Sequence, residues 1–276
     1  HNSARGGLVH LAFGAWRGRV FPGRVSLWFI TDILGRIFFW SGMVCLVIAL
    51  AGPIVISKEK VFLSQGNDIL FVVDISPSMG ARDEPEASRL DLAKAEIKAF
   101  LEQRSNDAIG LVAFASDAAL YCPPTLDYRT MAAAVDNLKV MDLGEGTATG
   151  LGLALAAVHL RQTGGKNKTI ILISDGDNNA GEISPEMAAQ MLARHHMRVY
   201  ALGLGSDQEV YIEYENPQEQ KVYRGAYQSS INETLLKNLA DATGGRYFRT
   251  ASAKGLSEIL GTVNNLETSE TRVRQE

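Results

Sequence analysis

The sequence predicts an α/β protein: a doubly wound, mostly parallel, Rossmann-like sheet with one short antiparallel edge strand, preceded by a transmembrane helix. Two patterns predict the sheet. Several short runs are apolar at successive positions, which is typical of strands covered on both faces. Segments with helical periodicity lie between these runs, as in βαβ architectures. A twenty-residue run without charge, placed before the sheet, predicts the membrane helix.

The composition excludes several classes of protein. The 276 residues include 27 basic and 31 acidic side chains, a net charge of −4, and 46% are hydrophobic. These values exclude a disordered chain and a strongly basic nucleic-acid binder, so we expect no nucleic-acid partner. The charge is uneven, however: the N-terminal basic segment, residues 1–36, holds five arginines and a single acid.

The uncharged run Ile37–Ile56 is the predicted transmembrane helix. About 20 helical residues span a hydrocarbon core of ~30 Å. A buried core helix and the apolar region of a signal peptide are the alternatives. The arginines before the run predict that its N-terminal side faces the cytoplasm, which would place the rest of the chain across the membrane.

Residues 61–266 form the predicted soluble domain. Its parallel strands are the apolar runs Ile69–Val73, Ile109–Phe114, Thr169–Ile173 and Val199–Leu204. A helix is expected to begin after Ser88, because Asp91 three residues later completes a capping box. Ala118–Cys122 is expected to pair antiparallel with the strand before it, at the edge of the sheet.

The remaining elements complete the alternation. The spacing of Leu151, Leu155 and Val158 predicts a helix before the central strand, and Ser184 caps another after it. Gln208–Ser229 interrupts the alternation as either a strand-like excursion or a loop. We expect the later elements to be a helix from Glu233, a strand over Arg246–Arg249, a helix over Ala253–Leu266 and a polar tail over 267–276.

Polar side chains follow two of the predicted strands. Asp74, Ser76 and Ser78 come directly after the first strand, and Asp175 follows the central one. A loop containing Thr147 precedes the helix between them. Ligands of such sheets bind at the carboxyl ends of the strands. Carboxylate and hydroxyl oxygens without histidine or cysteine suit Mg²⁺, Mn²⁺ or Ca²⁺.

In these residues the sequence resembles the von Willebrand factor A (VWA) domains. Their metal-ion-dependent adhesion site combines Asp-x-Ser-x-Ser, a threonine in a later loop and an aspartate after a central strand. The resemblance implies that Ser76 and Ser78 bind the metal directly, and that Asp74, Asp175 and Thr147 bind it directly or through water. It also implies an open coordination position that takes a carboxylate from a partner protein.

Three further residues stand beside this predicted site. Thr149 is the competing hydroxyl in the threonine loop, and we expect it to cap the following helix instead. Asp177 and Asn178 are expected at the rim of the site, although a solvated turn is equally compatible with the sequence. All three are candidates for contact with a partner.

The stretches ILISDGDNNAGEISPEMAA and ATGGRYFRTAS, with the apolar run before them, resemble BatA-like bacterial aerotolerance membrane proteins. In that group the domain sits between transmembrane helices, so a further helix is expected after the polar tail. The resemblance and the N-terminal arginines together imply a bacterial inner-membrane protein with a periplasmic domain.

The function predicted from these observations is a non-enzymatic, membrane-anchored module that binds a partner protein through its metal. The alternative is an accessory subunit of a MoxR-type ATPase-linked assembly or stress-tolerance complex, with related VWA proteins as further partners. A metal-dependent hydrolase is less favoured, because Ser76 stands where haloacid dehalogenase-type phosphatases carry a second aspartate. A helix–loop–helix calcium site starting at Asp175 is also less favoured, because its sixth position requires glycine and is occupied by Ala180.

Overall fold

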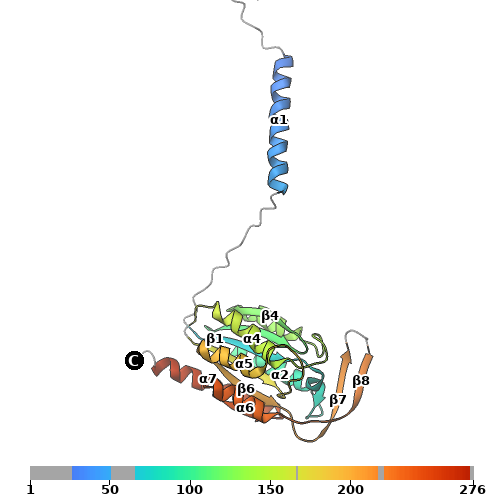
Figure 1. Cartoon of the computed structure of the whole chain (residues 1–276), viewed down its shortest axis with the longest axis vertical. Coiled ribbons are helices and arrows are strands. Elements are labelled where there is room, and N and C mark those ends of the chain that lie inside the picture. Colours follow the sequence, from blue (N-terminus) through green and yellow to red (C-terminus); the bar gives the residue numbers. More distant parts are fainter. Residues whose placement is uncertain (1–26, 51–65, 166, 217–220, 274–276) are drawn as a thin grey trace, which may run out of the picture. The chain divides into compact units, whose positions relative to one another are not determined.

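The computed structural model describes residues 27–50, 66–165, 167–216 and 221–273 (Figure 1). The chain divides into two compact units, residues 1–59 and 60–276. In the first unit, the described residues form the single helix α1 (Leu27–Leu50). The second unit contains the sheet, its helices and the predicted site.

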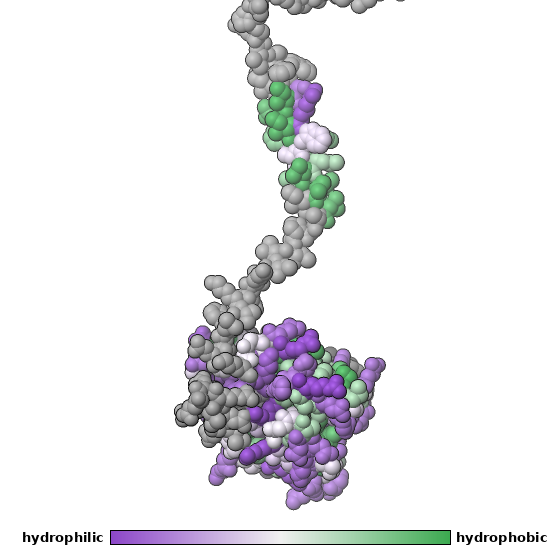
Figure 2. All heavy atoms as spheres, turned by 60° about the vertical axis from the view of Figure 1, so that its left-hand side comes forward, coloured by the Kyte–Doolittle hydropathy of each residue, from purple (hydrophilic) through white to green (hydrophobic). Residues whose placement is uncertain are grey.

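Helix α1 differs from the predicted transmembrane span. It begins at Leu27, includes the charged pair Asp32 and Arg36, and ends at Leu50. Residues 51–56 of the predicted span lie outside the described residues, as does most of the basic segment. None of the helices in the described ranges is both long and apolar enough to cross a membrane. The described surface of α1 is nevertheless largely apolar, whereas the visible face of the second unit is mainly hydrophilic (Figure 2).

The main sheet has six strands in the order β4-β3-β1-β5-β6-β9. Their bounds are β1 Asp68–Asp74, β3 Ala108–Phe114, β4 Ala118–Thr125, β5 Lys168–Ser174, β6 Met197–Leu204 and β9 Tyr247–Thr250. Five are parallel, and β4 pairs antiparallel with β3 at one edge. The predicted mostly parallel sheet with an antiparallel edge strand is therefore confirmed.

Six helices cover this sheet, three on each face. Their bounds are α2 Arg89–Glu102, α3 Tyr128–Asp136, α4 Thr149–Arg161, α5 Pro185–Arg194, α6 Glu233–Ala242 and α7 Ala253–Val273. Helices α2, α3 and α7 pack in one buried cluster with side chains of the strands, and α4, α5 and α6 pack in the other. Successive residues of β1 alternate between the clusters: Phe71 and Val73 enter the first, and Leu70 and Val72 the second.

The starts of α2 and α5 follow the predicted capping chemistry. Ser88 and Asp91 form a complete capping box at α2, and the Ser184 side chain accepts a hydrogen bond from the backbone of Met187 at the start of α5. Helix α3 was not predicted. The last helix also extends further than expected: α7 continues past Leu266 to Val273 and so includes most of the predicted tail.

The second unit also has a small antiparallel sheet in the order β2-β7-β8, which was not predicted as a sheet. Strand β2 (Ala81–Arg82) follows a short 3₁₀ turn, Pro77–Gly80. Strands β7 (Glu209–Asn216) and β8 (Lys221–Gln228) form a hairpin that extends from one end of the domain (Figure 1). Of the two alternatives for Gln208–Ser229, the strand-like excursion is therefore the correct one.

Candidate metal-binding site

The site lies where the strand order reverses. From β1 the chain adds β3 on one side and β5 on the other, so the loops after β1 and β5 diverge at the carboxyl edge of the sheet. Because β1 and β5 are parallel neighbours, Asp74 at the end of β1 and Asp175 directly after β5 lie at the same edge. Both carboxylates are completely buried.

Hydrogen bonds fix the orientation of Asp74. Its Oδ1 accepts from the backbone N–H of Ser76 at 2.8 Å, and its Oδ2 accepts from the Ser174 hydroxyl at 2.7 Å. Ser174 also accepts from the backbone N–H of Gly176 at 3.0 Å, so it links the β1 loop to the β5 loop. Ser174 directly follows the predicted strand Thr169–Ile173 and was not among the predicted site residues.

The two predicted serines are adjacent. The Oγ atoms of Ser76 and Ser78 are 3.0 Å apart, and both residues are buried. Pro77 lies between the two serines at the start of the 3₁₀ turn. Its ring restricts the backbone φ angle and so helps to hold the two hydroxyls close together. The turn closes with a hydrogen bond from the Met79 N–H to the Ser76 carbonyl.

Thr147 reaches the same edge from the loop before α4. Its N–H donates to the Asn179 side chain at 2.8 Å, and its carbonyl accepts from the backbone N–H groups of Asn179 and Ala180. These bonds join the Thr147 loop to the loop after β5. Asn179 is thus a positioning residue that sequence analysis did not identify, because nothing local links it to residues 32 positions earlier.

Two of the expectations about neighbouring residues need correction. Thr149 is not the cap of α4: the N-cap is Ala148, and Thr149 is the first helical residue. Its hydroxyl donates to the Asp177 carbonyl, and it is fully buried, so it cannot contact a partner at the rim. The Asn178 side chain accepts from the Thr149 N–H and the residue is exposed, and Asp177 is half-buried. Contact of these two residues with a partner stays a prediction.

Two negatively charged carboxylates that are buried close together repel each other and lose their hydration. Burial and the charge of Asp175 raise the pKa of Asp74 to about 7, although hydrogen bonds from Ser174 and Ser76 act in the opposite direction. The Oδ2 atom of Asp175 is buried without a hydrogen-bond partner. Such a pair requires a proton or a positive charge nearby. A divalent cation fits this donor set.

Arg89, the first residue of α2, supplies part of the required positive charge. Its side chain is 1% exposed, its Nη1 lies 3.7 Å from the Asp175 Oδ2, and its Nε donates to Asp83 at 2.5 Å. Its Nη2 also donates to the Ser229 hydroxyl at 2.6 Å, next to the end of β8. The sequence gives no indication of this role, since an arginine in the first turn of an amphipathic helix is usually solvated.

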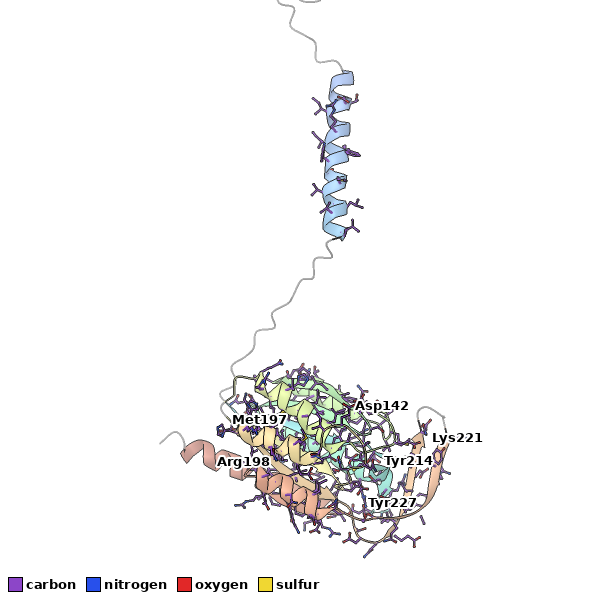
Figure 3. The ribbon with its side chains drawn as sticks, in the orientation of Figure 1. Asp142, Met197, Arg198, Tyr214, Lys221 and Tyr227 are labelled. Carbon is purple, nitrogen blue, oxygen red and sulfur yellow. The ribbon has the colours of Figure 1, made fainter. Side chains whose placement is uncertain are left out.

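A cleft of about 400 Å³ opens above these residues. One wall comes from the loops of the main sheet and the other from the hairpin; the lining includes Ser76, Ser78, Glu145, Thr147, Asp177, Ile212, Tyr214, Tyr223, Gly225 and Tyr227. Figure 3 shows Tyr214 and Tyr227 between the hairpin and the body of the domain, with Lys221 near its outer end. Burial and the charges of Asp175 and Asp177 raise the pKa of Tyr227, so its hydroxyl stays protonated at neutral pH.

No three histidine, cysteine, aspartate or glutamate side chains within the described residues are grouped so that they could hold a metal ion. The predicted set is of a different kind, because it combines two carboxylates with three hydroxyls. Ser76, Ser78 and Thr147 line the cleft, and the two carboxylates lie buried at the same edge.

The chain matches a family model and several relatives. Residues 69–178 match the von Willebrand factor type A domain. A UPF0353 protein of Nocardia farcinica is 31% identical over 241 residues, covering 80% of this chain and 68% of that protein. The chain belongs to the von Willebrand factor type A family. A protein of Borreliella burgdorferi is 36% identical over 211 residues, and the matched region spans 76% of the VWA chain and 62% of that protein.

Solved structures agree with this assignment. BatB from Bacteroides thetaiotaomicron has a TM-score of 0.63 and 28% identity, covering 75% of the VWA chain and 99% of its own. An aerotolerance-related membrane protein from Bacteroides fragilis has a TM-score of 0.63 and 26% identity over 74% and 100% of the two chains. Proximal thread matrix protein 1 of the mussel byssus shares the fold alone, with a TM-score of 0.54 and 23% identity over 75% of the VWA chain and 46% of its own. That structure is described with a zinc-occupied metal-ion-dependent adhesion site motif.

Proposed function

We propose that the VWA domain binds a divalent cation at the edge of its sheet and, through it, a carboxylate of a partner protein. The residues that would hold the cation are Asp74, Ser76, Ser78, Thr147 and Asp175. Their oxygen donors favour Mg²⁺, with Mn²⁺ or Ca²⁺ as alternatives. The observation that carries the proposal is the pair of fully buried carboxylates, one of them with an oxygen that lacks a hydrogen-bond partner.

The cation would supply positive charge to the buried pair and a binding position for an outside oxygen. The chain's own residues prepare the site: Ser174 and the Ser76 N–H orient Asp74, and Asn179 holds the Thr147 loop beside the serines. Within the described residues of the cleft no histidine or cysteine is available as a nucleophile or general base. We therefore propose a binding module rather than an enzyme.

We expect Asp74→Ala to abolish Mg²⁺ binding measured by calorimetry, while circular dichroism and thermal unfolding show a folded protein. Asp241→Ala, which removes an exposed carboxylate from α6, serves as the matched control and should bind Mg²⁺ like the wild type. Ser78→Ala provides a second variant with a smaller change at the site. Unchanged Mg²⁺ affinity in both Asp74→Ala and Ser78→Ala would refute the proposal.

Attachment to a membrane is the second part of the proposed function. The support is the uncharged run Ile37–Ile56 in the sequence and the large apolar side chains of α1, among them Phe38, Phe39 and Trp40, which are 66–70% exposed. The Bacteroides fragilis relative is described as a membrane protein. The N-terminal arginines favour a periplasmic domain at a bacterial inner membrane. A role beside a MoxR-type ATPase stays a prediction.

A further inference from the structure

One face of the β7–β8 hairpin is turned toward the candidate metal site. The antiparallel register pairs Tyr214 with Tyr223 and Ile212 with Gly225 on that face, and all four line the cleft. The rings of Tyr214 and Tyr223 stack with centroids 5.5 Å apart and an interplanar angle of 18°. Tyr227 follows on the same face of β8, because side chains alternate along a strand.

Gly225 leaves a notch in this face. A Cβ atom built on it would meet no heavy atom within 4 Å, and its φ is outside the left-handed region. Neither a crowded neighbour nor the backbone conformation therefore requires glycine at this position. Glycine within a strand weakens it and often marks a close approach by a ligand or another chain. The notch is the space over Gly225 between Tyr223 and Tyr227.

We propose that this notch admits an acidic side chain of a partner protein to the candidate metal site, an inference that rests on the proposed function. The opposite wall of the cleft includes Ser76, Ser78 and Thr147, the three residues whose hydroxyls are the candidate metal ligands. The tyrosine rings pack on the aliphatic part of the entering side chain, and their hydroxyls can donate to its carboxylate.

The charges of the cleft make this entry dependent on the cation. Glu145 and Asp177 line the cleft and would repel a carboxylate in the absence of a cation. The basic side chain in the lining, Arg224, is already paired with Glu213 at 2.7 Å. A partner's acidic side chain is thus favoured only when a divalent cation supplies the balancing charge. Tyrosine and arginine at the opening are also residue types enriched in protein interfaces.

The test uses the full chain and two matched peptides, acetylated and amidated Gly-Glu-Gly and Gly-Gln-Gly. Calorimetry first measures Mg²⁺ affinity of the wild type, Gly225→Val and Gln228→Val. Valine suits a strand position, and Gln228 lies on the other face of β8, is exposed and does not line the cleft. Nuclear magnetic resonance titrations then measure peptide binding with and without Mg²⁺.

We expect all three proteins to bind Mg²⁺ equally, and the wild type to bind the glutamate peptide only with Mg²⁺ and more tightly than the glutamine peptide. Gly225→Val should lower the affinity for the glutamate peptide by about tenfold or more, whereas Gln228→Val should leave that affinity unchanged. Equal affinity of Gly225→Val and the wild type for the glutamate peptide would overturn the proposed role of the notch. So would a wild type that binds Mg²⁺ but does not distinguish the peptides. A wild type that does not bind Mg²⁺ at all would instead overturn the proposed function, and with it the proposed role of the notch.

Discussion

At the scale of single residues, the site depends on a buried ionic network. The Arg89 guanidinium contacts two acids, Asp83 and Asp175, and donates to Ser229 near the hairpin. Asp83 also accepts from the Ser206 hydroxyl at 2.7 Å. Removing one member of such a network is costly, because the others remain buried with unbalanced charge. Arg89 therefore joins Asp175, directly after β5, to the base of the hairpin.

This network predicts a dependence of stability on pH. Burial by itself would raise the pKa of Asp83, but hydrogen bonds from Arg89 and Ser206 outweigh burial and hold the pKa below its ordinary value. The folded state binds this proton less tightly than the unfolded state does. The contribution of Asp83 to the free energy of unfolding is thus complete above its unfolded pKa, near 4, and is lost as pH falls through the lower folded value.

We expect Asp83→Asn to lower the free energy of urea unfolding at about pH 6, and the difference from the wild type to shrink as pH approaches about 3. Urea titrations of both proteins at a series of pH values measure that difference. Carboxylates outside this network titrate alike in both proteins and cancel in the comparison. A difference that is the same at every pH would contradict the expectation.

At the scale of elements, the helix before β5 illustrates how far local patterns reach. The sequence correctly predicts a helix there, but Leu151, Leu155 and Val158, whose spacing predicts it, do not form its most buried face. In the structure Val158 is 46% exposed, and Leu153 and Leu160 are buried against the sheet. The helix is apolar on most sides, so its periodicity alone does not specify which side faces the core.

Contact between α4 and β3 gives a prediction about this packing. A Cβ atom at Gly152 would lie 2.9 Å from ring atoms of the buried Phe114. We therefore expect Gly152→Val to lower the free energy of unfolding by about 1–3 kcal/mol through overpacking. Val158→Leu on the exposed face should change it by less than about 0.5 kcal/mol. Urea unfolding measures both, and equal stability of Gly152→Val and the wild type would contradict this packing.

The hairpin illustrates the opposite case, an element whose pattern was present in the sequence. Val210, Ile212 and Tyr214 alternate with polar or exposed residues along β7, as expected for a strand with one covered face. A loop was an equally good alternative because the segment is rich in acids and contains a proline. Pairing with β2, more than 100 residues earlier, favours the strand, and no local pattern reports that pairing.

At the scale of the whole molecule, the buried core lies within the second unit. Both buried clusters of the domain draw only on residues between Ile69 and Val263. Among the side chains of α1 that the structure describes, none belongs to either cluster. The domain therefore has its own core, whereas the proposed membrane attachment depends on the first unit.

Deletion of residues 1–59 should consequently separate the two properties. We expect the shortened chain to unfold in urea at the same midpoint as the domain of the full chain, because its core is unchanged. We expect the full chain to float with phosphatidylcholine–phosphatidylglycerol vesicles and the shortened chain not to do so. A shortened chain that still floats with the vesicles would contradict attachment through the first unit.

The sequence by itself determined the alternation of strands and helices, the caps at Ser88 and Ser184, and the residues Asp74, Ser76, Ser78, Thr147 and Asp175 as one candidate site. The first two properties are local. The site follows partly from the rule that parallel strands end at a common edge and partly from the resemblance to VWA domains, which supplies the choice of Thr147. Only the tertiary structure decided that Ser174, Asn179 and Arg89 support that site and that the hairpin faces it. The physical reason is that each of these roles depends on contacts between segments distant in the chain, which periodicity and capping do not encode.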